Sequence, residues 1–84
     1  MGQQLLEIDM ALISSIKPQA LQVEASHKEV DCTFSIIAKD GEKYLQLDTY
    51  GSKGRKIPGK KSQSFRFTPS AVLSLKKIIQ ENGL

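Results

Sequence analysis

The clearest pattern in the chain is an alternation of apolar and polar residues on both sides of an Asp-Gly pair. Asp40 and Gly41 suit a two-residue type I′ turn, because both tolerate positive φ angles, so residues 31–39 should face residues 42–50 in an antiparallel hairpin. One face then gathers mainly apolar side chains, from Cys32, Phe34, Ile36, Leu45, Leu47 and Thr49. The other face is polar and bears aromatic residues: Asp31, Thr33, Ser35, Ile37, Tyr44, Gln46, Asp48 and Tyr50. The pattern predicts both the hairpin and its register.

Two shorter segments alternate in the same way and predict one strand on each side of the hairpin. The first contains Leu21, Val23 and Ala25, and the polar residues 26–29 that follow can turn it back against the hairpin. The second contains Gln63, Phe65 and Phe67. The sequence therefore predicts a curved, antiparallel, four-stranded sheet over residues 19–68, interrupted by a loop at 51–61.

A helix is predicted over residues 69–82. Thr68 suits an N-cap, Pro69 suits the first helical position, and Gly83 suits the end of the helix. Its apolar stripe consists of Ala71, Val72, Leu75, Ile78 and Ile79. This stripe should cover the sheet face that bears Phe34, Ile36, Leu45, Leu47, Phe65 and Phe67. The expected fold is α+β, with a C-terminal helix on one face of the sheet and the polar face open.

Residues 1–18 fit either a strand or a helix. Leu6, Ile8, Met10 and Leu12 alternate as in a strand, whereas Leu5, Ile8, Leu12 and Ile16 share one helical face. The helical propensity of the local residues slightly favours a helix, and Pro18 ends the element in either case.

The chain of 84 residues forms one domain, residues 1–84, because it is too short to divide its apolar residues between two cores. No apolar run approaches the ~20 residues of a membrane span, and no signal peptide is visible, so we expect an intracellular protein without membrane contact. A single Cys and a single His allow neither an internal disulfide nor the usual zinc site. Such a small core favours a homodimer.

Charge is distributed unevenly along the chain. Residues 1–48 carry four Lys or Arg and eight Asp or Glu, whereas residues 49–84 carry eight and one. The loop at 51–61 holds five of these cations, Lys53, Arg55, Lys56, Lys60 and Lys61, with no acidic residue. A cationic, glycine-containing loop is typical of phosphate binding, although many such loops are only solvated surface.

Catalytic motifs are weak. Residues 54–61 imitate a nucleotide-binding P-loop, but Lys61 stands where a hydroxyl should reach magnesium, and the loop leads into a strand. His27 falls in a predicted turn, and Cys32 on the inward face is expected to be a small buried residue. The sequence predicts no enzyme, no cofactor, no metal and no small-molecule substrate.

The second half of the chain resembles a known family. The residues that carry the resemblance are the strand Lys43–Tyr50, the segment Pro58-Gly59-Lys60-Lys61 with the strand up to Phe67, and Thr68-Pro69 at the start of an apolar helix. Over roughly residues 30–80 they resemble the transcriptional positive coactivator (positive cofactor four) family of single-stranded DNA-binding proteins. The resemblance implies dimerisation through the helices and binding of melted or single-stranded DNA by the sheet and basic loops. It assigns phosphate contacts to Lys60 and Lys61 and an aromatic contact to Tyr50.

Together these patterns predict a homodimeric module that binds single-stranded DNA, or less favourably RNA, in transcription, replication or repair. Bases would stack on Tyr44 and Tyr50. Arg66, on the same face, would join the loop cations in phosphate contacts. The alternative is a protein-interaction module, such as a phage, plasmid or defence-associated accessory factor, whose basic loop docks on an acidic protein surface.

Overall fold

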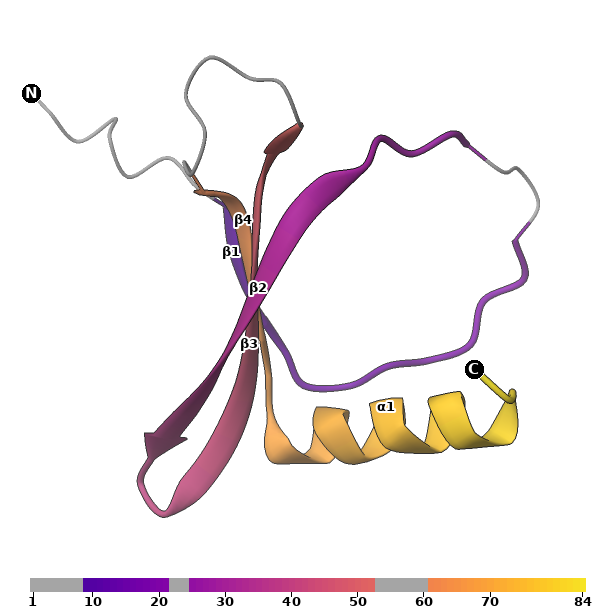
Figure 1. Ribbon diagram of the computed structural model, residues 1–84. Helices are drawn as coiled ribbons and strands as arrows, with labels where there is room; N and C mark the ends of the chain where they lie inside the picture. Colours follow the sequence, from indigo (N-terminus) through magenta and orange to yellow (C-terminus); the bar gives the residue numbers. More distant parts are fainter. Residues whose placement is uncertain (1–8, 22–24, 53–60) are drawn as a thin grey trace, which may run out of the picture.

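The computed structural model describes residues 9–21, 25–52 and 61–84. These form β1 (Asp9–Ile13), β2 (Val30–Lys39), β3 (Glu42–Ser52), β4 (Lys61–Phe67) and α1 (Pro69–Glu81), as shown in Figure 1. The strands make one open sheet in the order β1-β4-β3-β2. The predicted α+β fold, a four-stranded sheet followed by a C-terminal helix, is confirmed. The sheet is mixed rather than wholly antiparallel, because β1 runs parallel to β4.

The predicted hairpin is confirmed in its turn and in nearly all of its register. Asp40 and Gly41 have φ angles of 53° and 79°, which suit the predicted tight turn. The confirmed pairs include Ile36 with Leu45, Phe34 with Leu47, Ile37 with Tyr44 and Thr33 with Asp48. At the open end, an irregularity between Val30 and Cys32 shifts the register by one residue, so the expected pairing of Asp31 with Tyr50 does not form.

The strand beside β4 comes from the N-terminal segment. Residues 9–13 form β1, so the strand alternative is correct there and the slight preference for a helix is wrong. The parallel pairing with β4 gives β1 main-chain hydrogen-bond partners, which the helical propensity of the single residues does not take into account. The strand expected around Leu21 and Ala25 is not formed at either of these residues, and residues 22–24 lie outside the described ranges.

The helix begins and ends close to the predicted positions. The Thr68 Oγ1 atom accepts a hydrogen bond of 3.2 Å from the Ala71 N–H, and Pro69 follows the cap, as expected. Asn82 caps the other end, and Gly83 adopts a φ of 66° directly after it. Within the part of the chain that the structure describes, no helix has the length and apolar character needed to cross a bilayer.

The core lies where α1 packs on β3 and β4. Phe67 and Ala71 are the buried apolar residues among those described, with 9% and 0% exposure. The expectation that α1 would also cover Phe34 and Ile36 is wrong, since they remain 71% and 58% exposed. In Figure 1 the β2–β3 turn and the C-terminal end of α1 lie on opposite sides, so the helix leads away from that turn. Cys32, expected to be buried, is exposed as well, so that expectation is also wrong.

Candidate functional site

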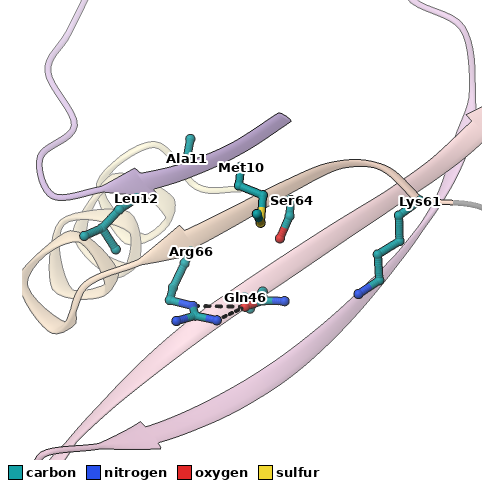
Figure 2. Close-up of a pocket in the computed structure, with 7 residues that line it drawn as sticks. All are labelled: Met10, Ala11, Leu12, Gln46, Lys61, Ser64 and Arg66. Carbon is teal, nitrogen blue, oxygen red and sulfur yellow. Dashed lines mark hydrogen bonds between the residues drawn. The ribbon is translucent and has the colours of Figure 1, made fainter. Parts of the chain in front are cut away.

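A pocket of about 370 Å³ lies on the polar face of the sheet, where β1, β3 and β4 run beside one another. Its lining is drawn in Figure 2 and consists of Met10, Ala11, Leu12, Gln46, Lys61, Ser64 and Arg66. Arg66 points to the side of β4 opposite Phe67, because successive strand residues face opposite sides of a sheet. The pocket is therefore on the face opposite the buried side chain of Phe67, and combines an apolar β1 wall with polar groups of β3 and β4.

A network of polar side chains crosses from β4 to β3 beside the pocket. Arg66 donates from Nε and Nη2 to Gln46 Oε1, at 2.9 and 2.6 Å, as Figure 2 shows. The Gln46 amide in turn donates to both carboxylate oxygens of Asp48, at 3.2 and 3.3 Å. The Lys61 ammonium lies 3.3 Å from Asp48 Oδ2. Arg66 can only donate hydrogen bonds and the Asp48 carboxylate can only accept them. The Gln46 side-chain amide must therefore direct its oxygen to Arg66 and its nitrogen to Asp48.

Asp48 is the acidic centre of this network and is only 4% exposed. A hydrogen bond from Ser64 lowers the pKa of its carboxyl most, and hydrogen bonds from Gln46 and Lys61, with the Lys61 charge, lower it further. Burial works in the opposite direction, but the net pKa is lowered. With Asp48 ionised, the network contains one carboxylate and two cations, Lys61 beside Asp48 and Arg66 beside Gln46, so it carries an excess positive charge.

Both tyrosines lie on the same face as this network and are half-buried rather than enclosed. The Tyr50 hydroxyl shares a 3.0 Å hydrogen bond with the hydroxyl of Thr33 on β2. The Tyr44 hydroxyl donates to Glu42 at 3.4 Å. Each tyrosine is therefore restrained at its hydroxyl while part of its side chain remains open to solvent.

The structure brings together four of the predicted binding residues on the open face: Tyr44, Tyr50, Lys61 and Arg66. The other four, Lys53, Arg55, Lys56 and Lys60, lie outside the described residues. They belong to the connection between β3 and β4, whose described ends are Ser52 and Lys61.

Sequence reasoning assigned no role to several residues that build the site: Met10, Leu12, Gln46, Asp48 and Ser64. The hairpin register placed Gln46 and Asp48 on the polar face, so a signal for these two existed. Met10 and Leu12 join the site through the parallel pairing of β1 with β4, for which the sequence offers no local signal.

Residues 9–21, 25–52 and 61–84 were also compared with the side-chain arrangements that metal binding and nucleophilic catalysis require. No cluster of three His, Cys, Asp or Glu side chains that could hold a metal occurs in these ranges. His27 Nδ1 lies 2.8 Å from the Ala25 carbonyl oxygen, and Cys32 Sγ donates to the Thr33 carbonyl at 3.6 Å. Both side chains are thus bonded to nearby main chain.

Comparison of the chain with protein-family models, with curated proteins and with solved structures finds no match. The resemblance to the positive coactivator family therefore stays a prediction from the sequence.

Proposed function

We propose that this chain is a non-catalytic module that binds single-stranded nucleic acid on the open face of its sheet, with DNA preferred to RNA on the strength of the family resemblance. The observation that carries the proposal is the position of Tyr44, Tyr50, Lys61 and Arg66 on one face of the sheet, where Lys61 and Arg66 also line a pocket. Cations that neutralise phosphates and aromatic rings on which bases stack are the two elements of single-strand binding.

Phosphate binding is supported by the unused capacity of the two cations. The Lys61 side chain is 45% exposed although it pairs with Asp48. Arg66 uses Nε and Nη2 to bind Gln46, and within the described residues its Nη1 group has no hydrogen-bond partner. A guanidinium held by one edge presents its remaining donors in a fixed direction, which suits a phosphate oxygen.

Base binding is supported by the mixed lining of the pocket. Met10 and Leu12 are 74% and 63% exposed and form an apolar wall, opposite the polar side chains of Gln46 and Arg66. A nucleobase has apolar faces and a polar rim, so it matches such a wall and such donors. Its rim and faces are accessible only when the strand is unpaired, which favours single strands over duplex.

The sequence between β3 and β4 contains four further cations, Lys53, Arg55, Lys56 and Lys60. Each cation that contacts a phosphate releases condensed counterions, so affinity should fall with rising salt. Contacts to the backbone and to base faces carry little sequence information, and we expect weak sequence preference.

The test is a fluorescence-anisotropy titration with single-stranded and double-stranded oligonucleotides at two salt concentrations. The variant Lys60→Ala/Lys61→Ala should bind the single strand at least about tenfold more weakly, and the salt slope should fall by about 2, roughly 1 for each lysine that no longer binds a phosphate. The matched control is Lys76→Ala/Lys77→Ala, which removes the same charge from α1. Equal losses of affinity in both variants, or no binding by the parent chain at low salt, contradict the proposal.

A second titration separates stacking from charge. Tyr50→Ala leaves the net charge unchanged and should weaken single-strand binding roughly 5-fold to 150-fold, corresponding to about 1–3 kcal/mol for one stacked base. Leu73→Ala is the control, since it removes an exposed apolar side chain from α1. If Tyr50→Ala has no effect while the lysine variant still weakens binding, the cations act without base stacking, and the docking of an acidic protein surface becomes the better account.

A further inference from the structure

One edge of the sheet is long, and the central part of its strand is uncharged. The strand β2 has ten residues and forms the edge next to β3, whereas the opposite edge, β1, has five. Between Asp31 and Lys39, all seven residues of β2 are uncharged, and most are β-branched, aromatic or small. Edge strands of monomeric proteins are usually short or interrupted by charges, because a bare edge pairs with other strands. The central part of β2 has no such protection.

The side chains and main chain of β2 are also available. Phe34 and Ile36 are 71% and 58% exposed, and no large side chain of the described residues is fully buried. Within the described ranges, β2 makes no main-chain to main-chain hydrogen bond beyond its ladder with β3, and Cys32 Sγ contacts the Thr33 carbonyl at 3.6 Å. Every second residue of an edge strand directs its N–H and C=O groups outward, so β2 presents a row of unused donors and acceptors.

We propose that β2 pairs antiparallel with β2 of a second copy of this chain, across a two-fold axis at Ser35, to form a continuous eight-stranded sheet. The charges at the two ends of the strand select this register. Asp31 and Lys39 lie at equal distances on either side of Ser35, so each faces the opposite charge on the second copy. Neither residue has an ion-pair partner within the described part of the chain.

The same register joins the apolar side chains. Residues directly opposite one another in an antiparallel pair point to the same face, so Phe34 lies opposite Ile36 of the second copy, and the reverse. If the axis moved by one residue, to Phe34 or Ile36, residues opposite one another would still point to the same face. Asp31 would then no longer lie opposite Lys39 of the second copy. A two-fold axis perpendicular to the sheet also directs both open polar faces to the same side. The assembly itself does not depend on what those faces bind.

Disulfide trapping tests the register. In a Cys32→Ala background, which removes the only cysteine, Ser35→Cys places a thiol on the axis, opposite itself. The oxidant diamide should then give a covalent dimer on a non-reducing gel. The matched control, Thr33→Cys, has its residue on the same face but away from the axis, and should stay monomeric on the gel. Equal trapping at both positions, or trapping at Thr33 alone, overturns the proposed register.

Sedimentation equilibrium without nucleic acid tests the association, so its result is independent of the proposed function. Asp31→Lys and Lys39→Asp should each raise the dimer dissociation constant by roughly tenfold, because like charges then face one another twice, and the double variant should restore it. Phe34→Lys should give monomers, whereas Leu73→Lys, an exposed position on α1, should not. A parent chain that stays monomeric at high concentration overturns the proposal, as does a dimer sensitive to Leu73→Lys but not to Phe34→Lys.

Discussion

The two halves of the sheet, called here the β4 side and the β2 side, differ in how completely their side chains are buried. On the β4 side, α1 covers Phe67, and Asp48 and Ser64 are buried in a polar network. On the β2 side, nine of ten strand residues are exposed, including the large side chains of Phe34 and Ile36. The comparison shows that this short chain covers only one half of its sheet with other parts of the chain. Stability should therefore reside on the β4 side, and the β2 side should be free for assembly.

The largest difference between the two sides should appear on removing a phenylalanine ring. Phe67→Ala should lower the free energy of unfolding by about 3 kcal/mol or more, because the cavity forms beneath α1. Phe34→Ala should change it by less than about 1 kcal/mol in the monomer, since its ring is mostly in solvent already. Urea denaturation at a concentration that keeps the chain monomeric measures both. Similar losses for the two variants would remove the distinction between the sides.

The cap that joins β4 to α1 should give a smaller effect. Thr68 accepts from the Ala71 N–H through its side chain, and its own N–H donates to the Ile13 carbonyl at 3.0 Å. Thr68→Ala should cost about 1 kcal/mol, the usual cost of losing an N-cap. Thr68→Ser, which keeps the hydroxyl, is the control. Thermal unfolding followed by circular dichroism is the measurement, and an unchanged Tm for Thr68→Ala would contradict the assigned cap.

The hydroxyl contact between β3 and β2 should contribute less again. Tyr50→Phe removes the hydrogen bond to Thr33, which is exposed, and should cost about 0.5 kcal/mol. Tyr44→Phe removes a longer hydrogen bond of 3.4 Å to Glu42 and should cost no more than that. Urea denaturation of both variants checks this order. A destabilisation comparable to that of Phe67→Ala would show that the β2 side contributes more stability than its exposure indicates.

The pH dependence should produce a limited effect that belongs to the β4 side. The pKa of Asp48 is lowered in the folded state, first by the hydrogen bond from Ser64. Its contribution is therefore complete above the unfolded-state pKa, near about 4, and is lost as pH falls through the lower folded value. Urea denaturation from pH 6 down to pH 2 should show this loss, and Asp48→Asn should make the curve flatter. A curve of identical shape in the variant would contradict the role of Asp48.

The parts of the fold set by local chemistry could be predicted from the sequence. Asp40 and Gly41 define the turn, the alternation on either side defines the register, and Thr68 with Pro69 defines the start of the helix. The pairing of β1 with β4 joins segments far apart in the chain and left no local signal. The strand expected from the alternation at residues 21–25 does not form at Leu21 or Ala25, and the alternation alone does not show whether a partner edge is available.

The candidate site divides in the same way. Tyr44, Tyr50 and Arg66 could be assigned to the open face, since each follows from the register of β3 or from alternation in β4. The pocket could not be predicted, because its apolar wall depends on Met10 and Leu12 of β1. The exposure of Cys32 could not be predicted either, because it depends on how far α1 extends across the sheet.

The most direct test of the central claim is to map the binding surface by NMR while a single-stranded oligonucleotide is added. We expect the side-chain signals of Arg66 Nε–H and of the Gln46 amide to shift, together with the aromatic signals of Tyr44 and Tyr50. The backbone amide signals of α1 should not shift. Shifts confined to α1, or none on the open face at saturating oligonucleotide, would contradict the account.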